Sequence, residues 1–356
     1  MTSPTAGAAD VEAARLLLAR LGISAEQLLD QPRTMHTVPT FDDYIERVSA
    51  AVGDGTARVY RTYWNRVRDA WGSRTIDSVT ALDIKELAER MKADLVIRRN
   101  ARGGRTAVEH LIGALRCLYQ FAIDDGLIDE RANPSARVSK PRRLASTRHA
   151  LHGDQLDQIR GVAEDTSNDP DLDTLLIDFH SQTASRRGGA LALRPRDLDG
   201  EQCMVKLREK GETERWQPVS PSLMRRLIAH GAERDSLDPE GPLIRYLNGR
   251  VVTRRRYDSM WVRIGNHLPW VKAQGISTHW IRHTTLTWVE RNFGYAVARA
   301  YAGHNERRSD GTTATYVKGQ VFEVAAALAA YTGEAHPMAA GQPAQPVARH
   351  PSALGF

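Results

Sequence analysis

The sequence predicts a mainly α-helical protein of two domains with one small β-hairpin. Apolar residues recur at three- and four-residue spacing through residues 41–130 and in much of 150–332, which is the period of amphipathic helices. One pair of alternating segments, "QCMVKLR" and "ERWQPV", flanks the turn "EKGET" and indicates a hairpin. A length of 356 residues with 41% hydrophobic content is enough for two packed cores.

Composition and charge argue against several classes of protein. No apolar run reaches the roughly 18 residues of a membrane span, and the N-terminus lacks the features of a signal peptide, so we expect a cytoplasmic protein. Cys117 and Cys203 have no C-x-x-C partner, which argues against a disulfide framework and against a thiolate metal site. The net charge of +6 and the pI near 9.4 favour a polyanionic partner.

The N-terminal part divides into an extension and a helical domain. Residues 1–36 hold one short amphipathic stretch and a proline-containing segment, typical of an arm or linker. Residues 37–132 carry the helical period throughout and predict a bundle of four or five helices. We expect helix N-caps at Thr56 and Thr80, and helix ends at Gly72 and Gly126.

Two segments near this domain are strongly basic and contain no acidic residue. One is the loop "IRRNARGGRTA", and the other is "NPSARVSKPRRLASTRH", whose prolines interrupt helix and which we interpret as an interdomain linker over 133–149. Each could be an ordinary solvated segment or could contact DNA phosphates. The candidate DNA-contacting residues are Arg98, Arg99, Arg102, Arg105, Arg137, Lys140, Arg142 and Arg143.

The second domain is expected over residues 150–334. It begins with the helical segments "HGDQLDQIRGVAE" and "DLDTLLIDFHSQTASRRGGALAL", continues through the hairpin, and ends in the helix "VFEVAAALAAYTG". Residues 335–356 are rich in proline, alanine and glycine and are expected to form a disordered tail.

The segment "STHWIRHT" holds the first candidate for chemistry. His279 and His283 are four residues apart on an expected helix, a spacing that suits a metal. The zinc peptidase motif, however, needs a glutamate where Trp280 stands, and no third ligand is in view, so we expect no metal. His279 and Arg282, three residues apart, would instead place a proton-transfer group beside a fixed cation suited to phosphate.

Other candidates follow in a definite order along the chain. Arg186 stands in "QTASRRGGALALRPRDLD", at the start of a helix expected to end at Asp197, and Lys210 stands in the hairpin turn. His304 follows in "AGHN", and Tyr316 stands in a polar segment ahead of the last helix. With the H-x-x-R pair, this order resembles the tyrosine recombinases, or phage-type integrases. That family carries an arginine in a segment like TGLRxSELLAL, a hairpin lysine, H-x-x-R-H, G-H and a nucleophilic tyrosine.

The resemblance implies a fold, an activity and partners. The fold would be a helical core-binding (SAM-like) domain followed by a tyrosine-recombinase catalytic domain. The activity would be site-specific DNA strand cleavage and rejoining through a 3′-phosphotyrosine, with integration or excision of a mobile element as the favoured role. The partners would be double-stranded DNA with a recombination site, a homotetramer on two such sites, and an accessory DNA-bending or directionality factor. The protein would then be associated with the nucleoid.

The resemblance also assigns roles to single residues. Tyr316 would attack the phosphodiester; the other catalytic residues would be Arg186 and Arg282 on the non-bridging oxygens, Lys210 as the acid for the leaving 5′ oxygen, His279 in proton transfer and His304 as a donor to the phosphate. Cations of the protein would neutralise the phosphate and the covalent bond would store its energy, so that no metal, ATP or other cofactor is expected.

Some features depart from the family or leave alternatives open. Gly189 stands where an acidic residue is common, and the interval from His304 to Tyr316 is longer than usual. The apolar face of the last helix could pack on its own domain or dock into a neighbouring protomer. A type IB topoisomerase-like relaxing enzyme and a non-catalytic DNA-binding protein of the same fold are the alternative functions.

Overall fold

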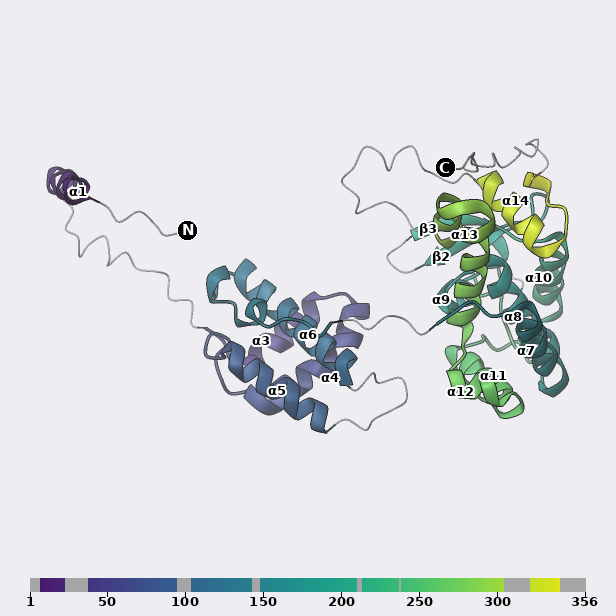
Figure 1. The fold of residues 1–356 in the computed structure, drawn as a ribbon, viewed down its shortest axis with the longest axis horizontal. Helices are drawn as coiled ribbons and strands as arrows, with labels where there is room; N and C mark the ends of the chain where they lie inside the picture. Colours follow the sequence, from purple (N-terminus) through teal and green to yellow (C-terminus); the bar gives the residue numbers. More distant parts are fainter. Residues whose placement is uncertain are drawn as a thin grey trace, which may run out of the picture. The chain divides into compact units, whose positions relative to one another are not determined.

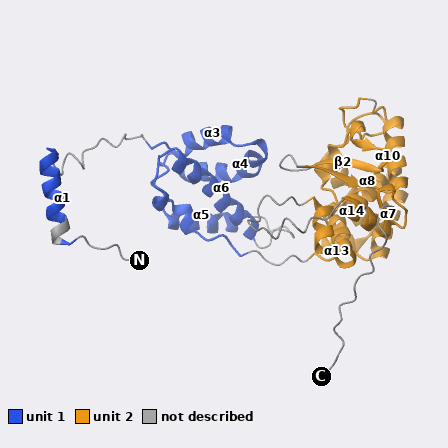
Figure 2. Ribbon diagram, turned by 90° about the horizontal axis from the view of Figure 1, so that it is seen from above, with its two compact units in different colours: residues 1–144 blue, residues 145–356 orange. Residues whose placement is uncertain are grey.

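The computed structural model describes residues 7–22, 38–94, 104–142, 148–209, 213–236, 238–303 and 321–339. It divides the chain into two compact units, residues 1–144 and 145–356 (Figure 2). The division falls inside the basic segment 133–149 that the sequence marks as a linker. None of the described helices has the length and apolar character needed to cross a membrane.

The first unit is a bundle built around one long helix, α6 (Figure 1). Helix α6 packs against α3, α4 and α5 and buries residues on several faces, including Leu111, Ile112 and Ala114. The Trp64 indole donates to the Ala114 carbonyl at 3.1 Å, which anchors α4 on α6. The elements of this unit are α1 (Ala8–Leu21), α3 (Phe41–Ala51), α4 (Asp54–Trp71), α5 (Ala81–Ala93), α6 (Arg105–Asp124), η2 (Glu130–Ala132) and η3 (Pro134–Arg137).

Three of the four expected helix boundaries are confirmed in this unit. Thr80 caps α5 in a capping box with Asp83, Gly72 follows α4 directly, and Gly126 has φ of 69° just beyond the end of α6. The expectation of an N-cap at Thr56 is wrong. Helix α4 begins at Asp54 after Gly53, and the Thr56 amide already donates to the Gly53 carbonyl at 2.9 Å within the first turn.

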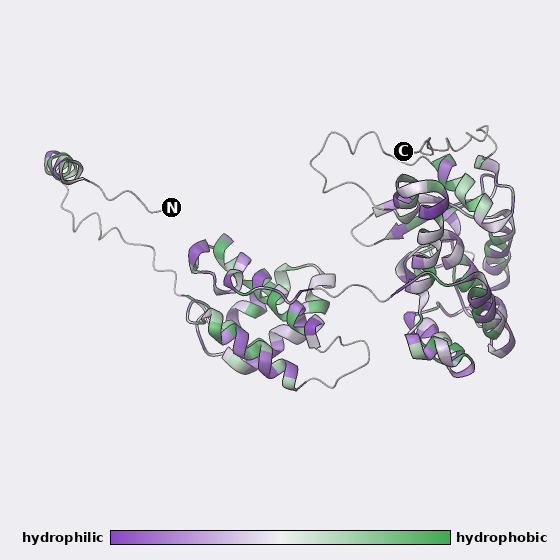
Figure 3. Cartoon of the chain, in the orientation of Figure 1, coloured by the Kyte–Doolittle hydropathy of each residue, from purple (hydrophilic) through white to green (hydrophobic). Residues whose placement is uncertain are grey.

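The second unit packs helices around the largely buried helix α8 and contains a small antiparallel sheet of order β1-β2-β3, which contacts α9 and α14. The predicted hairpin is confirmed as β2 and β3, with Met204 opposite Pro218 and Glu209 opposite Thr213. The two-residue strand β1 was not foreseen, because it is too short to show a period. Coloured by hydropathy, helices of both units carry hydrophobic and hydrophilic residues side by side, as amphipathic helices do (Figure 3).

The helices of this unit are α7 (Gly153–Thr166), α8 (Pro170–Thr183), α9 (Arg187–Leu191), α10 (Pro221–Glu233), α11 (Arg254–His267), α12 (Pro269–Gln274), α13 (Thr278–Ala302) and α14 (Val321–Thr332). The strands and short 3₁₀ segments are η4 (Pro195–Asp197), β1 (Leu198–Asp199), β2 (Met204–Glu209), β3 (Thr213–Pro218) and η6 (Pro337–Ala339). Helix α13 is interrupted at Gly294, whose φ of 84° is left-handed.

Two expectations about this stretch are corrected in part: the helical segment "DLDTLLIDFHSQTASRRGGALAL" is interrupted, and the helix expected from Arg186 to Asp197 starts there but ends early. Helix α8 ends at Thr183, because Ala184 adopts a left-handed φ of 48°. Helix α9 spans five residues, and Pro195 opens a separate 3₁₀ turn, since proline cannot continue an α-helix. The expected helix start at Arg186 is confirmed, whereas the expected end at Asp197 is wrong, and the break at Ala184 places Arg186 in a tight turn between α8 and α9.

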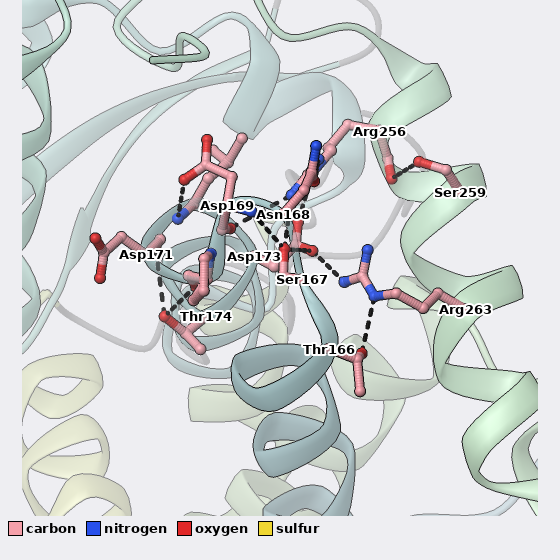
Figure 4. A network of polar contacts seen from close by, with 12 residues as sticks. Thr166, Ser167, Asn168, Asp169, Asp171, Asp173, Thr174, Arg256, Ser259 and Arg263 are labelled. Carbon is pink, nitrogen blue, oxygen red and sulfur yellow. Dashed lines mark hydrogen bonds and ion pairs between the residues drawn. The ribbon is translucent and has the colours of Figure 1, made fainter.

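A buried network of charges holds α11 against the turn between α7 and α8 (Figure 4). Asp173 is fully buried and pairs with both Arg256 and Arg263 of α11. Arg256 also donates to Asn168 Oδ1 at 2.8 Å, and Arg263 donates to Thr166 Oγ1 at 3.0 Å. Because both arginines share one buried carboxylate, removing Asp173 would leave two cations uncompensated and release α11.

Two features of the C-terminal end bear on the expectations. Of the four residues expected on the apolar face of α14, Val324, Ala325 and Leu328 are buried within their own unit, whereas Val321 is 37% exposed. Most of this face therefore packs on its own domain. The expected disordered tail begins at residue 335, yet residues 335–339 are placed. His336 is only 4% exposed, and its Nε2 contacts the Cys203 carbonyl at 3.2 Å, which anchors the chain after α14.

Candidate active site

Three of the six expected catalytic residues line one cavity of the second unit. Arg186 comes from the turn between α8 and α9, whereas His279 and Arg282 come from the first turns of α13. The cavity has a volume of about 630 Å³, and Asp258, Trp261 and Val262 of α11 form another part of its wall. Residues almost one hundred positions apart in the sequence therefore meet around a space large enough for a phosphodiester.

The turn that carries Arg186 is fixed by its own side chains. Thr183 Oγ1 donates to the Phe179 carbonyl at 2.6 Å and accepts from the Ser185 amide at 3.2 Å. Ser185 is buried, and Arg186, the next residue, is exposed. The left-handed Ala184 reverses the chain between them and α8, a conformation that costs a residue with a Cβ about 1 kcal/mol or more. Arg186 is thus presented at the surface by a buried, hydrogen-bonded turn.

Arg282 connects this turn to the far end of α13. Its side chain is 4% exposed and donates to the Ala184 carbonyl and, at 2.9 Å, to the Ala302 carbonyl. A buried guanidinium requires such partners, because an uncompensated charge in the interior is costly. The consequence is a cation held in a fixed orientation at the wall of the cavity, with the Arg186 turn on one side and the end of α13 on the other.

His279 lies one helical turn before Arg282 and reaches solvent at the mouth of the cavity. Partial desolvation lowers the pKa of its imidazole, and the positive charges of Arg148, Arg282, His283 and Arg186 lower it further. The neutral imidazole is therefore favoured at neutral pH, which is the form that accepts a proton.

Two further residues shape the site and were missed in the sequence. Gly303, which ends α13 with φ of 67°, lies so close to Arg215 of β3 that an added Cβ would be 2.4 Å from the Arg215 Nε. Arg215 in turn donates to the Thr183 carbonyl at 3.4 Å. In the sequence, Gly303 stands out only as the first residue of the G-H motif, with no sign of its contact to β3. The segment "ERWQPV" likewise gives no signal that distinguishes Arg215 from an ordinary surface residue of a strand.

The remaining expected catalytic residues, Lys210, His304 and Tyr316, lie outside the described residues. The strands that flank Lys210 in the sequence are confirmed as a hairpin. The described chain reaches Gly303, and Arg282 holds the carbonyl of Ala302 just before it. Within the described ranges, no cluster of three or more His, Cys, Asp or Glu side chains could hold a metal ion.

Half of the expected DNA-contacting residues are among the described residues of the first unit. Arg105, Arg137, Lys140 and Arg142 are exposed, whereas Arg98, Arg99, Arg102 and Arg143 lie outside the described residues. Lys85, Lys92 and Arg137 line a groove of about 380 Å³ together with Val138, Ser139 and Pro141.

The start of the basic linker is fastened to this unit. Arg116 of α6 donates to the Val138 carbonyl at 3.0 Å and to the Ser135 carbonyl at 3.4 Å. Arg116 was not identified in the sequence, because it stands inside the apolar pattern of a helix. It gives the basic segment after Pro134 a fixed starting point on α6.

Known proteins resemble this chain in sequence and in fold. No family model matches the chain. A tyrosine recombinase XerC of Chlamydia caviae is 24% identical over 240 residues, covering 65% of this chain and 70% of that protein.

Solved structures share the fold. A lambda integrase tetramer bound to a Holliday junction matches 88% of this chain and 92% of its own with a TM-score of 0.58 at 13% identity. The Tn1549 transposon integrase in complex with a circular intermediate DNA matches 79% of this chain and 95% of its own with a TM-score of 0.58 at 18% identity.

Gly189 remains a departure within this agreement. It is buried, and its amide donates to the Arg186 carbonyl at 2.9 Å, so it takes part in the turn without supplying an acidic group. The sequence match, the shared fold and the convergence of Arg186, His279 and Arg282 on one cavity do not depend on that position. The chain is thus similar in sequence to a tyrosine recombinase and shares the fold of integrases of that family.

Proposed function

We propose that this protein is a site-specific DNA recombinase that cleaves and rejoins DNA strands through a 3′-phosphotyrosine intermediate. The observation that carries the proposal is the single cavity lined by Arg186, His279 and Arg282. Two guanidinium groups there would face the non-bridging oxygens of one phosphodiester, and a planar guanidinium can bind two such oxygens at once. The charge that develops on those oxygens in the transition state is then stabilised by cations that are already in place.

The covalent step can be written with every proton assigned. The Tyr316 hydroxyl attacks the phosphorus, its proton passes to His279, and the bond between phosphorus and the 5′ oxygen breaks. Lys210 donates a proton to the leaving 5′ oxygen, and His304 donates a hydrogen bond to the phosphate. An unperturbed phenol has a pKa of about 10 and needs such a base near pH 7. The lowered pKa of His279 favours the neutral form that this role requires.

The basic surface of the first unit would supply the affinity for duplex DNA. Arg105, Arg137, Lys140 and Arg142 are exposed there, and the residues expected to join them are Arg98, Arg99, Arg102 and Arg143. Contacts to phosphates give affinity that falls with salt, whereas recognition of one site requires contacts to base edges as well. We assign the phosphate contacts to these arginines and lysines.

The biological role we propose is integration or excision of a mobile element by a tetramer on two DNA sites. The fold is that of a lambda integrase tetramer on a Holliday junction and of a transposon integrase on circular intermediate DNA. An accessory protein that bends DNA or sets direction would fit such a role. Because α14 is part of its own core, the surfaces between protomers would lie elsewhere.

The decisive experiment is covalent capture. The protein is incubated with nicked suicide substrates that carry candidate recombination sites, in EDTA and without ATP, and the products are separated under denaturing conditions. We expect a protein–DNA adduct with the wild-type protein and none with Tyr316→Phe.

Each other outcome has a distinct meaning. An adduct that persists in Tyr316→Phe would show that another residue is the nucleophile. A site that the protein binds but never cleaves would favour a non-catalytic DNA-binding protein. Adducts at many unrelated sequences, with relaxation of supercoils and no strand exchange, would favour a topoisomerase-like enzyme.

A further inference from the structure

A buried histidine lies directly beneath the Arg186 turn and has no part in the mechanism above. His180, on the last turns of α8, is 1% exposed. Its Nδ1 lies 3.1 Å from the Ser185 carbonyl oxygen and 3.2 Å from the Ser185 Oγ, and its Nε2 lies 2.8 Å from the Tyr257 hydroxyl. Both ring nitrogens are thus engaged, one with the Arg186 turn and one with α11.

These contacts specify the protonation state of the ring. A carbonyl oxygen can only accept, so Nδ1 must carry a proton and donate to Ser185. In a neutral imidazole Nε2 then accepts, and the Tyr257 hydroxyl is its donor. Burial lowers the pKa of His180 to about 4, so the neutral ring persists throughout the neutral range. The single tautomer satisfies both nitrogens.

The two partners of His180 belong to two walls of the cavity. Ser185 directly precedes Arg186, and Tyr257 belongs to the same helix as Trp261, which also lines the cavity. A second contact spans the same gap near the surface, where Arg187 Nη1 donates to Asp258 Oδ1 at 3.1 Å. That surface pair is exposed and weak, whereas the His180 contacts are buried. The buried ring therefore sets the separation of the two walls.

We propose that His180 is a positioning residue that holds the Ser185–Arg186 turn, and hence the Arg186 guanidinium, in register with α11 and the cavity. Gly189 has no side chain that could support the Arg186 turn, and the contact from His180 to the Ser185 carbonyl would provide that support instead. The inference rests on the proposed function, because it assumes that Arg186 binds the reacting phosphate.

Two substitutions distinguish the contribution of the Nδ1 contact from that of the Nε2 contact. The amide nitrogen of asparagine falls near the place of Nδ1, so His180→Asn retains a donor for the Ser185 carbonyl. The amide of glutamine falls near the place of Nε2, so His180→Gln retains a partner for Tyr257 and loses the contact to Ser185. The matched control is His230→Gln, because His230 is also buried in this unit, accepts from the Arg245 amide at 3.2 Å and lies away from the cavity.

The first readout is the rate of covalent capture at saturating DNA, together with the DNA dissociation constant. We expect His180→Gln to lower the capture rate about ten- to a hundredfold, as displacement of a phosphate-binding group by about 1 Å can do, with little change in DNA affinity. His180→Asn should recover most of the rate, and His230→Gln should retain it. Loss of the same size in His180→Asn and His180→Gln would overturn the assignment to the Ser185 contact.

The second readout is amide hydrogen exchange at residues 183–187 without DNA, which requires no activity. We expect faster exchange there in His180→Gln and unchanged exchange in His180→Asn and His230→Gln. The positioning role alone would be overturned if the wild-type protein forms the adduct and His180→Gln captures DNA at the same rate, with residues 183–187 equally protected from hydrogen exchange. A wild-type protein that forms no adduct on bound DNA would overturn the proposed function, and the catalytic meaning of His180 with it.

Discussion

Gly303→Ala tests how the end of α13 is fastened beside the site. At φ of 67° the left-handed conformation of an alanine lowers the free energy of unfolding by about 1–2 kcal/mol. The reduced freedom of the unfolded chain raises it by about 0.4–1 kcal/mol. The new Cβ would also stand 2.4 Å from Nε and 2.6 Å from Cδ of Arg215. These atoms are in the middle of the Arg215 side chain, so the arginine must move.

Moving Arg215 has a cost of its own. The side chain would lose its bonds to the Thr183 carbonyl and to Gln217 Oε1, and hydrogen bonds from a charged group contribute about 1.5–3 kcal/mol. Together with the backbone strain, we expect Gly303→Ala to lower the free energy of unfolding of the second unit by about 2–4 kcal/mol. For a unit of this size, that corresponds to a Tm lowered by roughly 4–16 °C.

The assay is urea and thermal denaturation with a matched control. Gly333 has a similar φ of 72° but no atom within 4 Å of an added Cβ, so Gly333→Ala reports the backbone strain without the contact. Combining Gly303→Ala with Arg215→Ala should give less destabilisation than the sum of the two single changes. Equal losses for Gly303→Ala and Gly333→Ala, or strict additivity in the double variant, would refute the reasoning.

Three other predictions concern the site and the DNA surface. Arg282→Lys should abolish covalent capture and lower the free energy of unfolding of the second unit by about 1–3 kcal/mol in urea. The reason is that an ammonium group cannot bind the Ala184 and Ala302 carbonyls together. An unchanged unfolding midpoint would contradict this. Because the pKa of His279 is lowered, its base form persists below the usual histidine range. The capture rate should be flat near neutrality and fall only as the pH drops through that lowered pKa, and a decline that persists in His279→Gln would assign it elsewhere. In a salt titration of DNA binding, Arg137→Ala and Lys140→Ala should each reduce the slope of log K against log salt by about 1, and an unchanged slope would place these residues off the DNA.

The sequence alone determined the helical class, the hairpin and the order of the catalytic motifs. Helical periods and turn residues are local, so they can be read from neighbouring letters. The same is true of the capping box at Thr80, where the pairing residues are three positions apart. The helix end expected at Asp197 overlooked a local signal, because Pro195 already stops an α-helix. The left-handed break at Ala184 has no such local signal and depends on what surrounds the chain.

The tertiary structure decided which motif residues meet and what holds them. Arg282 reaches the carbonyls of Ala184 and Ala302, and His180 reaches Tyr257, across sequence separations that no local pattern encodes. The apolar face of α14 could have served its own core or another subunit, and its burial at Leu328 assigns it to its own core. Burial and long-range hydrogen bonds are properties of the folded chain, so the positions of Arg186 and Arg282 at one cavity follow only from its packing.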